Sequence, residues 1–366
     1  MKKLLFIAAI AGAALVSCTK NEVAQSVNEQ KAISFATPIV GVTTKAPTYG
    51  LLTEHPTTQT FNVWGWYSEA DEYVADETVK AYMTDVKVAY NSGNFNNAET
   101  ENGAWAPTPT YFWPKNGQLT FDAYSPTEIQ TGNNVKCDKA TGLTIENYVV
   151  PNTLENQIDV LFSDRTYDNV STSFTSGNTY EGVDIAFNHA LSAIAFNVAQ
   201  AGDYADGTLT IKSIAVDAFS KGTFTQNIQT DRTQSPAWTA AETLRYTILE
   251  KGNYAASQHL TTTLTAAGST ALMLPQVFSS SKAKVTIEYY IKNNDEDPLL
   301  QVYTFELNQE VNQSGEDSDG NTVTVNKWEM GKRYTYNITI GLQGIYFAPT
   351  VTGWTDVTVD LPQINN

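Results

Sequence analysis

The sequence predicts an all-β protein built from two tandem β-sandwich domains, and three observations support this prediction. Short segments rich in Val, Ile, Thr, Tyr and Phe recur along the chain, and most of them alternate apolar with polar residues, as half-buried strands do. Clusters such as NSGNFNN, KNGQ and NNDEDP separate these segments and predict turns. The length of 366 residues suggests two domains, and strands that follow one another without intervening helices favour sandwiches over a parallel sheet.

The start of the chain has the pattern of a secretory signal peptide over residues 1–17. Lys2 and Lys3 precede an apolar run at residues 4–16, which is shorter than the roughly 20 residues of a membrane-spanning helix. The run ends in LVSC, which resembles the lipobox of bacterial lipoproteins, whose cysteine becomes the acylated first residue of the mature chain. We therefore expect Cys18 to carry acyl chains such as palmitate, each buried CH₂ of which contributes about 0.8 kcal/mol to membrane binding. An ordinary signal peptide with an incidental cysteine is the alternative.

Charge and cysteine content narrow the classes of partner. Loss of residues 1–17 removes two of the 22 basic residues and no acidic one, which leaves 20 basic against 39 acidic residues and a net charge of −19. This balance disfavours nucleic acid and anionic lipid surfaces as partners. If Cys18 carries lipid, Cys137 has no partner for an intramolecular disulfide, so the hydrophobic core must stabilise the fold.

After the signal peptide, the chain divides into a tether and two strand-rich halves. Residues 18–32 are polar and show no sustained period, so we expect a flexible tether between the lipid and the folded body. The polar stretch STSFTSGNTYE separates the two halves, and we place the domains at residues 33–178 and 179–366. Strands are expected at residues 86–90, 118–124, 143–150, 194–199, 209–216, 284–291, 300–307 and 334–340.

The sequence contains no pattern that indicates an enzyme, a metal site or a cofactor site. His55, His189 and His259 lie far apart and outside any HExxH, CxxC or GxSxG context. His189 lies between apolar residues, and a hydrogen-bonded histidine at the start of a strand is the simplest interpretation. Cys137 lies in VKCDKA, which we interpret as a polar loop.

The acidic loop EDSDGN partly resembles a calcium-binding EF-hand loop. Asp317, Asp319 and Asn321 occupy the first, third and fifth positions of that pattern. Thr322 stands where the sharp turn requires glycine, and Trp328 stands where a bidentate Glu is needed. The pattern therefore favours a solvated hairpin loop over a calcium site.

Aromatic residues are concentrated in the first half of the chain. They include Trp64, Trp66, Tyr67, Trp105, Tyr111, Trp113 and Tyr124. Stacked on a surface, such residues could bind sugars, but Trp64 and Trp66 alternate with Val63 and Gly65 and so lie on one face of a strand. Large aromatic residues usually fill the core of a sandwich, so we favour a core role.

Five stretches occur in a fixed order over most of the chain. They are FNVWGWY at residues 61–67, YFWPKNGQLTFDAYSP at 111–126, FNHALSAIAFNV at 187–198, LMLPQ at 272–276 and KWEMGKRYTYNITI at 327–340. Together they resemble the fimbrillin family, the lipoprotein precursors of type V pili in some Gram-negative bacteria. The resemblance implies transthyretin-like β-sandwich domains, display on the outer membrane, and a fimbrium that supports adhesion and assembles by strand exchange after proteolysis. It implies other pilin subunits, a processing protease, the outer membrane and host or bacterial surface ligands as partners, and no enzymatic role.

Strand exchange requires a removable first strand, and residues 33–40, ISFATPIV, fit one. Ile33, Phe35 and Ile39 fall on one face of this alternating segment. Pro38 has no N–H to donate to a central ladder, so the segment is predicted to be an edge strand.

Strand exchange also requires a proteolytic site beyond that strand. In the family, a trypsin-like protease cuts after Arg or Lys in this region, and Lys45 is the only basic residue of the turn-rich stretch GVTTKAPTYG. Cleavage between Lys45 and Ala46 would remove lipid, tether and first strand together, whereas cleavage at Lys31 would leave the strand in place. A lysine in an ordinary surface loop is the alternative.

The last requirement is a donor strand, for which VTGWTDVTVDL at residues 351–361 is the candidate. Val351, Val357, Val359 and Leu361 fall on one face, and burial of the four would contribute roughly 6–12 kcal/mol before ordering costs. Because few residues follow Leu361, the strand could instead belong to the second domain.

Two rival functions stay open: a monomeric glycan-binding surface lipoprotein and a β-sandwich hydrolase, which would need clustered carboxylates or a histidine pair in space.

Overall fold

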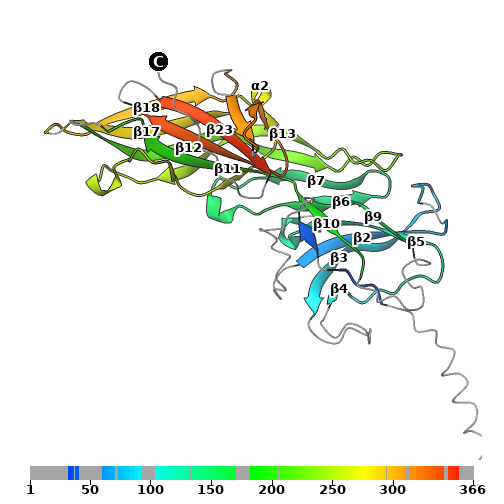
Figure 1. The fold of residues 1–366 in the computed structure, drawn as a ribbon. Helices are drawn as coiled ribbons and strands as arrows, with labels where there is room; N and C mark the ends of the chain where they lie inside the picture. Colours follow the sequence, from blue (N-terminus) through cyan, green and yellow to red (C-terminus); the bar gives the residue numbers. More distant parts are fainter. Residues whose placement is uncertain are drawn as a thin grey trace, which may run out of the picture.

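The computed structural model describes residues 32–36, 38–40, 60–70, 73–91, 104–131, 134–169, 182–203, 207–293, 295–309, 314–317, 319–341 and 345–353. Within these ranges nearly all regular structure is β-strand, which confirms the predicted all-β fold (Figure 1). All eight segments predicted as strands from the sequence overlap strands in the structure. The described helices are α2 (Phe278–Ser281) and the 3-10 turns Thr127–Ile129, Leu154–Asn156 and Ala256–Gln258. None of the helices in the described ranges has the length and apolar character to cross a membrane.

The first sheet has eight strands and contains most of the described strands of the first half of the chain. Its strands are β1 (Ile39–Val40), β2 (Thr60–Ser68), β3 (Lys80–Asn91), β4 (Ala104–Thr108), β5 (Gln118–Ser125), β8 (Leu161–Ser163), β9 (Thr166–Asn169) and β10 (Ala186–His189). They follow the order β1-β10-β8-β5-β2-β3-β4, with β9 also paired to β5. Strands β2 and β5 lie in the middle of this order and are buried on both faces, so the polar residues in TFNVWGWYS and QLTFDAYS are buried together with the apolar and aromatic ones.

Two further sheets contain most of the described strands of the second half of the chain, together with β6 and β7. The second sheet contains β11 (Ser192–Gln200), β14 (Thr265–Ala266), β15 (Ala271–Met273), β19 (Ser314–Asp317), β20 (Thr322–Thr324), β22 (Lys332–Ile340) and β23 (Ile345–Gly353). The third contains β6 (Val135–Asp138), β7 (Gly142–Val149), β12 (Gly207–Thr225), β13 (Ala237–Glu250), β17 (Lys284–Asn293) and β18 (Leu299–Glu306). Their orders are β14-β11-β22-β23-β19-β20, with β15 on β11, and β18-β17-β12-β7-β6, with β13 on β12. Strands β16 (Gln276–Val277) and β21 (Lys327–Trp328) form a small separate pair.

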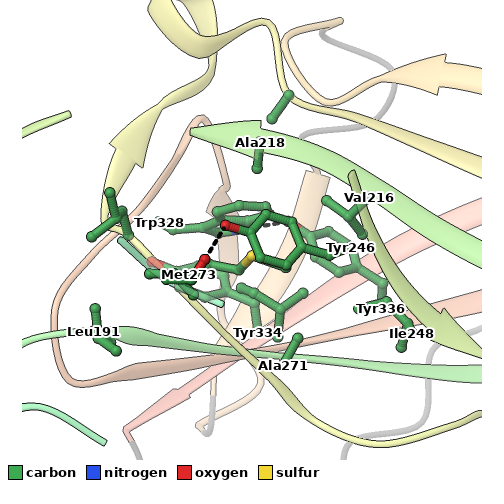
Figure 2. Packing of buried hydrophobic residues seen from close by; sticks show 14 of the residues in the cluster. Leu191, Val216, Ala218, Tyr246, Ile248, Ala271, Met273, Trp328, Tyr334 and Tyr336 are labelled. Atoms are coloured by element: carbon green, nitrogen blue, oxygen red, sulfur yellow. Dashed lines mark hydrogen bonds between the residues drawn. The ribbon is translucent and has the colours of Figure 1, made fainter. Parts of the chain in front are cut away.

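A large aromatic core lies between the second and third sheets. Strand β22 alternates in sequence, so Tyr334, Tyr336 and Ile338 share one face and are buried. Figure 2 shows Tyr336 and Tyr334 beside Tyr246 of β13 and Trp328 of β21, in the interior of this sandwich. The indole N–H of Trp328 donates to the hydroxyl of Tyr336 at 2.8 Å, so these two buried polar atoms satisfy each other.

The sheets do not divide at residue 178. Strands β6 and β7 precede that residue, but β7 pairs with β12, where Val149 lies opposite Lys221. Strand β10 follows it, but pairs with β8 of the first sheet. Figure 1 shows β6 and β7 where the lobe of β2–β5 meets the lobe of β11–β13. The polar stretch that suggested the boundary, residues 171–181, lies outside the described residues. A polar stretch indicates exposed chain, but it carries no information on which strands pair across it.

Candidate functional site: the contacts of the first segment

Residues 32–36 and 38–40, which we call the first segment, lie between the two ends of the first sheet. The N–H of Phe35 donates to the carbonyl oxygen of Trp105 in β4, with 2.8 Å between N and O. The N–H of Ala36 donates to the carbonyl oxygen of Val183 at 2.9 Å, and β1 then pairs in parallel with β10. Because β4 and β10 belong to opposite ends of the first sheet, the first segment connects these ends and closes the sheet around its core.

The first part of this segment differs from the edge strand that the sequence predicted. Phe35 has a paired neighbour on each side, antiparallel Trp105 and parallel Val183, whereas β1 stands at the end of the strand order. Pro38 lies between these two parts, outside the paired residues. Among the described residues, parallel pairing with residues 183–187 therefore occurs on both sides of the proline, whereas the antiparallel neighbour Trp105 is found only before it. The alternation of the side chains could not reveal this second neighbour.

The side chains of the first segment are an integral part of the core of the first sheet. Ile33 is 0% exposed and Phe35 is 1% exposed. The ring of Phe35 makes edge contacts with the rings of Phe61 in β2 and Phe121 in β5, each at 5.5 Å between ring centroids. Burial of one such side chain contributes about 1.5–3 kcal/mol, and aromatic edge contacts add about 0.5–1.5 kcal/mol each. The first segment thus contributes several kcal/mol to the core while remaining at the N-terminal end of the fold.

The structure confirms the core interpretation of the aromatic residues. Trp64, Trp66, Trp105, Trp113 and Tyr124 are buried, and Tyr67 and Tyr111 are half-buried and packed against the core. Trp64 and Trp66 share a face, as the alternation predicted, and pack toward β6 and β7 rather than toward solvent. The five buried residues therefore do not form a surface on which a glycan could stack.

Gly182 permits the close approach of the first segment to the chain before β10. Its φ is +105°, a conformation that favours glycine. A Cβ at this position would lie 2.5 Å from the carbonyl carbon of Phe35 and 2.6 Å from the nitrogen of Ala36. Both atoms are backbone, so neither can move aside without shifting the first segment itself.

We expect Gly182→Ala to loosen the first segment selectively, because the new methyl group would push its backbone away from Val183. The measurement is amide hydrogen exchange at Phe35 and Ala36, which should become faster. Gly252→Ala is the matched control, because Gly252 also has a positive φ, +73°, but a methyl group added there would have no atom within 4 Å. Both variants carry backbone strain of about 1–3 kcal/mol. If the amide of Phe35 were equally protected from hydrogen exchange in the two variants, the steric role of Gly182 would be contradicted.

The remaining predicted site residues fall in two groups. Cys18, Lys45, Ala46, Val357, Val359 and Leu361 lie outside the described residues, as do residues 18–31 of the tether. Val351 is described and belongs to β23, where it lies opposite Tyr334 of β22 on one side and Asp317 of β19 on the other. This part of the candidate donor strand is therefore held within its own subunit.

The two described histidines, His189 and His259, show no arrangement suited to catalysis. Nδ1 of His189 lies 2.8 Å from the carboxylate of Asp159, which confirms a hydrogen-bonded histidine, although at the end of β10 rather than at a strand start. Nε2 of His259 lies 3.0 Å from the hydroxyl of Tyr254, and His55 is outside the described residues. In the part of the chain that the structure describes, no three His, Cys, Asp or Glu side chains are grouped to hold a metal ion.

The acidic loop forms a hairpin turn between β19 and β20, as predicted. The carboxylate of Asp317 accepts hydrogen bonds from the backbone N–H groups of Asp319, at 3.0 Å, and Asn321, at 2.8 Å. Hydrogen bonds from Asn321 are the main cause that lowers the pKa of Asp317. The chain's own donors therefore satisfy the carboxylate that the calcium interpretation would have used.

A buried ion pair lies where the first sheet meets β6, and the sequence analysis missed it. Arg165 and Asp122 form a bidentate pair with side chains 1% and 0% exposed and 2.7 Å between the closest N and O. The guanidinium also donates to the carbonyl oxygen of Lys139, and the indole N–H of Trp66 donates to Asp122. Cys137, predicted to lie in a loop, instead belongs to β6, and its thiol approaches Asp122 at 3.4 Å. Burial, and secondarily the charge of Asp122, raise the pKa of this thiol.

The fold and these contacts define an all-β protein in which an N-terminal segment completes a sheet. The sequence matches the fimbrillin-like family over residues 57–354, so the chain belongs to that family. This match confirms the resemblance found in the sequence motifs. The family is one of structural fimbrial proteins rather than enzymes.

Comparison with solved structures finds the same fold in a fimbrial protein and lower similarity in other proteins. A fimbrial protein from Bacteroides vulgatus has a TM-score of 0.58 at 16% identity, covering 88% of this chain and 99% of that one. A candidate cell adhesion protein from Bacteroides uniformis has a TM-score of 0.48 at 16% identity, covering 88% and 98%. A fimbrilin from Porphyromonas gingivalis has a TM-score of 0.41 at 14% identity, covering 90% and 99%. No protein with a curated function matches the chain.

Proposed function

We propose that this chain is the precursor of a pilus subunit that supports adhesion. It is exported as an outer-membrane lipoprotein anchored through Cys18 and polymerises by donor-strand exchange after cleavage between Lys45 and Ala46. The observation that carries the proposal is the placement of the first segment, which is buried, hydrogen-bonded on both sides and N-terminal to every other described element. A terminal segment can leave the sheet without being threaded past any other strand.

Departure of the first segment would leave a site suited to another strand. The carbonyl oxygens of Trp105 and Val183 would lose their donors, and Phe61 and Phe121 would lose the ring of Phe35. Unpaired strand edges and newly exposed apolar groups are costly in water. An extended, alternating strand from another subunit would restore both kinds of contact by β-augmentation.

The donor in this proposal begins after Gly353. Strand β23 is hydrogen-bonded to β22 and β19, so releasing Val351 would break up its own sheet. We therefore assign the donor contacts to Val357, Val359 and Leu361. Burial of three such side chains contributes about 4.5–9 kcal/mol before ordering costs, and main-chain hydrogen bonds add to it.

The test is limited digestion of the chain from residue 19 onward with a trypsin-like protease. We expect a product that begins at Ala46 and a ladder of oligomers on a denaturing gel without heating. Lys45→Ala should block both the product and the ladder, whereas the matched variant Lys31→Ala should leave both intact. A stable monomer that keeps residues 33–45 and binds polysaccharide would instead favour the glycan-binding alternative.

A further inference from the structure

Strand β18 exposes a run of apolar side chains at the end of the third sheet. Leu299, Leu300, Val302 and Tyr303 are 63%, 41%, 60% and 45% exposed. The other large apolar residues exposed to this extent in the described ranges are spread over several separate elements. Among the described residues the only strand paired with β18 is β17, and Figure 1 shows β18 next to β17 in the upper lobe. Contiguous exposed apolar groups on a sheet edge mark an interaction surface.

The sequence of β18 lacks the features that keep edge strands apart. Residues 299–304, LLQVYT, contain no charged residue and no proline. Their ladder with β17 runs from Ile291 opposite Leu299 to Thr286 opposite Thr304 without a register shift, so no bulge turns this edge away. A regular, uncharged, apolar edge of this kind is a template for pairing with another strand.

The exposed residues are arranged symmetrically about one polar residue. Two large apolar side chains, Leu299 and Leu300, precede Gln301, and two more, Val302 and Tyr303, follow it. In an antiparallel pair of two copies centred on Gln301, Leu299 would lie opposite Tyr303 and Leu300 opposite Val302. Directly opposed residues share a sheet face, so each apolar side chain would meet an apolar partner on its own face.

We propose that β18 is a docking surface for β18 of a second copy of this chain, in an antiparallel pair with its two-fold axis at Gln301. The pair would join two third sheets into one continuous sheet and bury the exposed side chains on both of its faces. A contact between single strands buries less than the roughly 1,200–2,000 Å² of a typical stable interface, so isolated subunits associate weakly. Within a fibre, repeated copies of the contact would strengthen lateral association through multivalency.

Charge around β18 makes this association dependent on salt. The acidic residues Asp295, Glu296 and Asp297 precede the strand, and Glu306 ends it. In the proposed register Glu296 of one copy would lie opposite Glu306 of the other, and each copy carries a large negative net charge. Like charges repel across the contact and salt screens them, so association should increase from low to moderate ionic strength.

The first test is sedimentation velocity over a concentration series on the uncleaved chain from residue 19 onward. This protein keeps its first segment, so failure of donor-strand exchange would not affect the result. We expect a reversible dimer whose population rises with salt. Val302→Lys should raise the dissociation constant of the dimer at least tenfold, because the substitution places charge at the centre of the strand pair. Val74→Lys is the matched control, since Val74 has the same exposure of 60% outside β18. A monomer at all concentrations, or equal effects of the two variants, would overturn the proposal.

The second test determines the register. In a Cys137→Ser background, Gln301→Cys should form an intermolecular disulfide on mild oxidation, because the two-fold axis places residue 301 opposite itself. Thr304→Cys should not, because its counterpart in the pair is residue 298. Melting curves identical to that of the background protein would show that both variants fold. Cross-linking of both variants to the same extent, or of neither, would refute the pairing centred on Gln301.

Discussion

Phe35→Ala is expected to destabilise the first sheet by about 3–5 kcal/mol, the usual cost of truncating a fully buried phenylalanine. Phe35 is 1% exposed, and its ring contacts Phe61 and Phe121, which belong to the neighbouring strands β2 and β5 in the middle of the sheet. The alanine would leave a cavity that these rings cannot fill without moving. Chemical denaturation followed by tryptophan fluorescence measures the loss, because Trp105 contacts Phe61 in the same core.

The variant also tests the proposed mechanism. If the first segment leaves during assembly, weakening its attachment should raise the rate of proteolysis at Lys45 and the yield of oligomers. Phe112→Ala is the matched control, because Phe112 is 39% exposed and its loss should change stability by less than about 0.5 kcal/mol. An unfolding free energy unchanged by Phe35→Ala would show that the segment does not contribute to the folded subunit. If Phe35→Ala lowered stability but slowed oligomerisation, the first segment would not be the part of the chain that leaves the sheet during assembly.

The sequence predicted strands better than it predicted their partners. Alternation located β12, β17 and β22, because a half-buried strand imposes a period of two on its own residues. Pairing is a contact between distant residues, and alternation does not specify it. Strand β7, which carries β6 on its other side, therefore pairs with β12 across the predicted boundary, and Phe35 has two neighbours where one was expected.

The sequence indicates the ion pair between Asp122 and Arg165 less clearly than it indicates the strands. Asp122 is the one charged residue of the strand QLTFDAYS, which is buried at every position, and a charge in a buried strand needs a partner. Its partner could not be chosen from the sequence, because Arg165 lies 43 positions away, outside the strand itself. The exposure of β18 could not be predicted from the sequence either, because its nearly continuous apolar residues, LLQVYTFE, are typical of a strand buried on both faces.

Arg165→Met is expected to cost about 3–5 kcal/mol, because it leaves the carboxylate of Asp122 buried without its counter-ion. The matched control is Lys136→Met, which removes an ion pair with the same 2.7 Å separation but with side chains 50% and 39% exposed. Solvent screens that pair, so its loss should cost no more than about 1 kcal/mol. Thermal and denaturant unfolding of the two variants provide the comparison.

A double variant separates the charge from the other contacts of the pair. Asp122→Leu combined with Arg165→Met removes both charges, and apolar replacement of a buried ion pair is often neutral. Here the indole N–H of Trp66 and the carbonyl oxygen of Lys139 would lose their partners, so we expect recovery of only part of the stability. Full recovery would mean that these two polar groups find other partners. If Arg165→Met and Lys136→Met lowered the free energy of unfolding equally, the buried ion pair would contribute no more to stability than the exposed one.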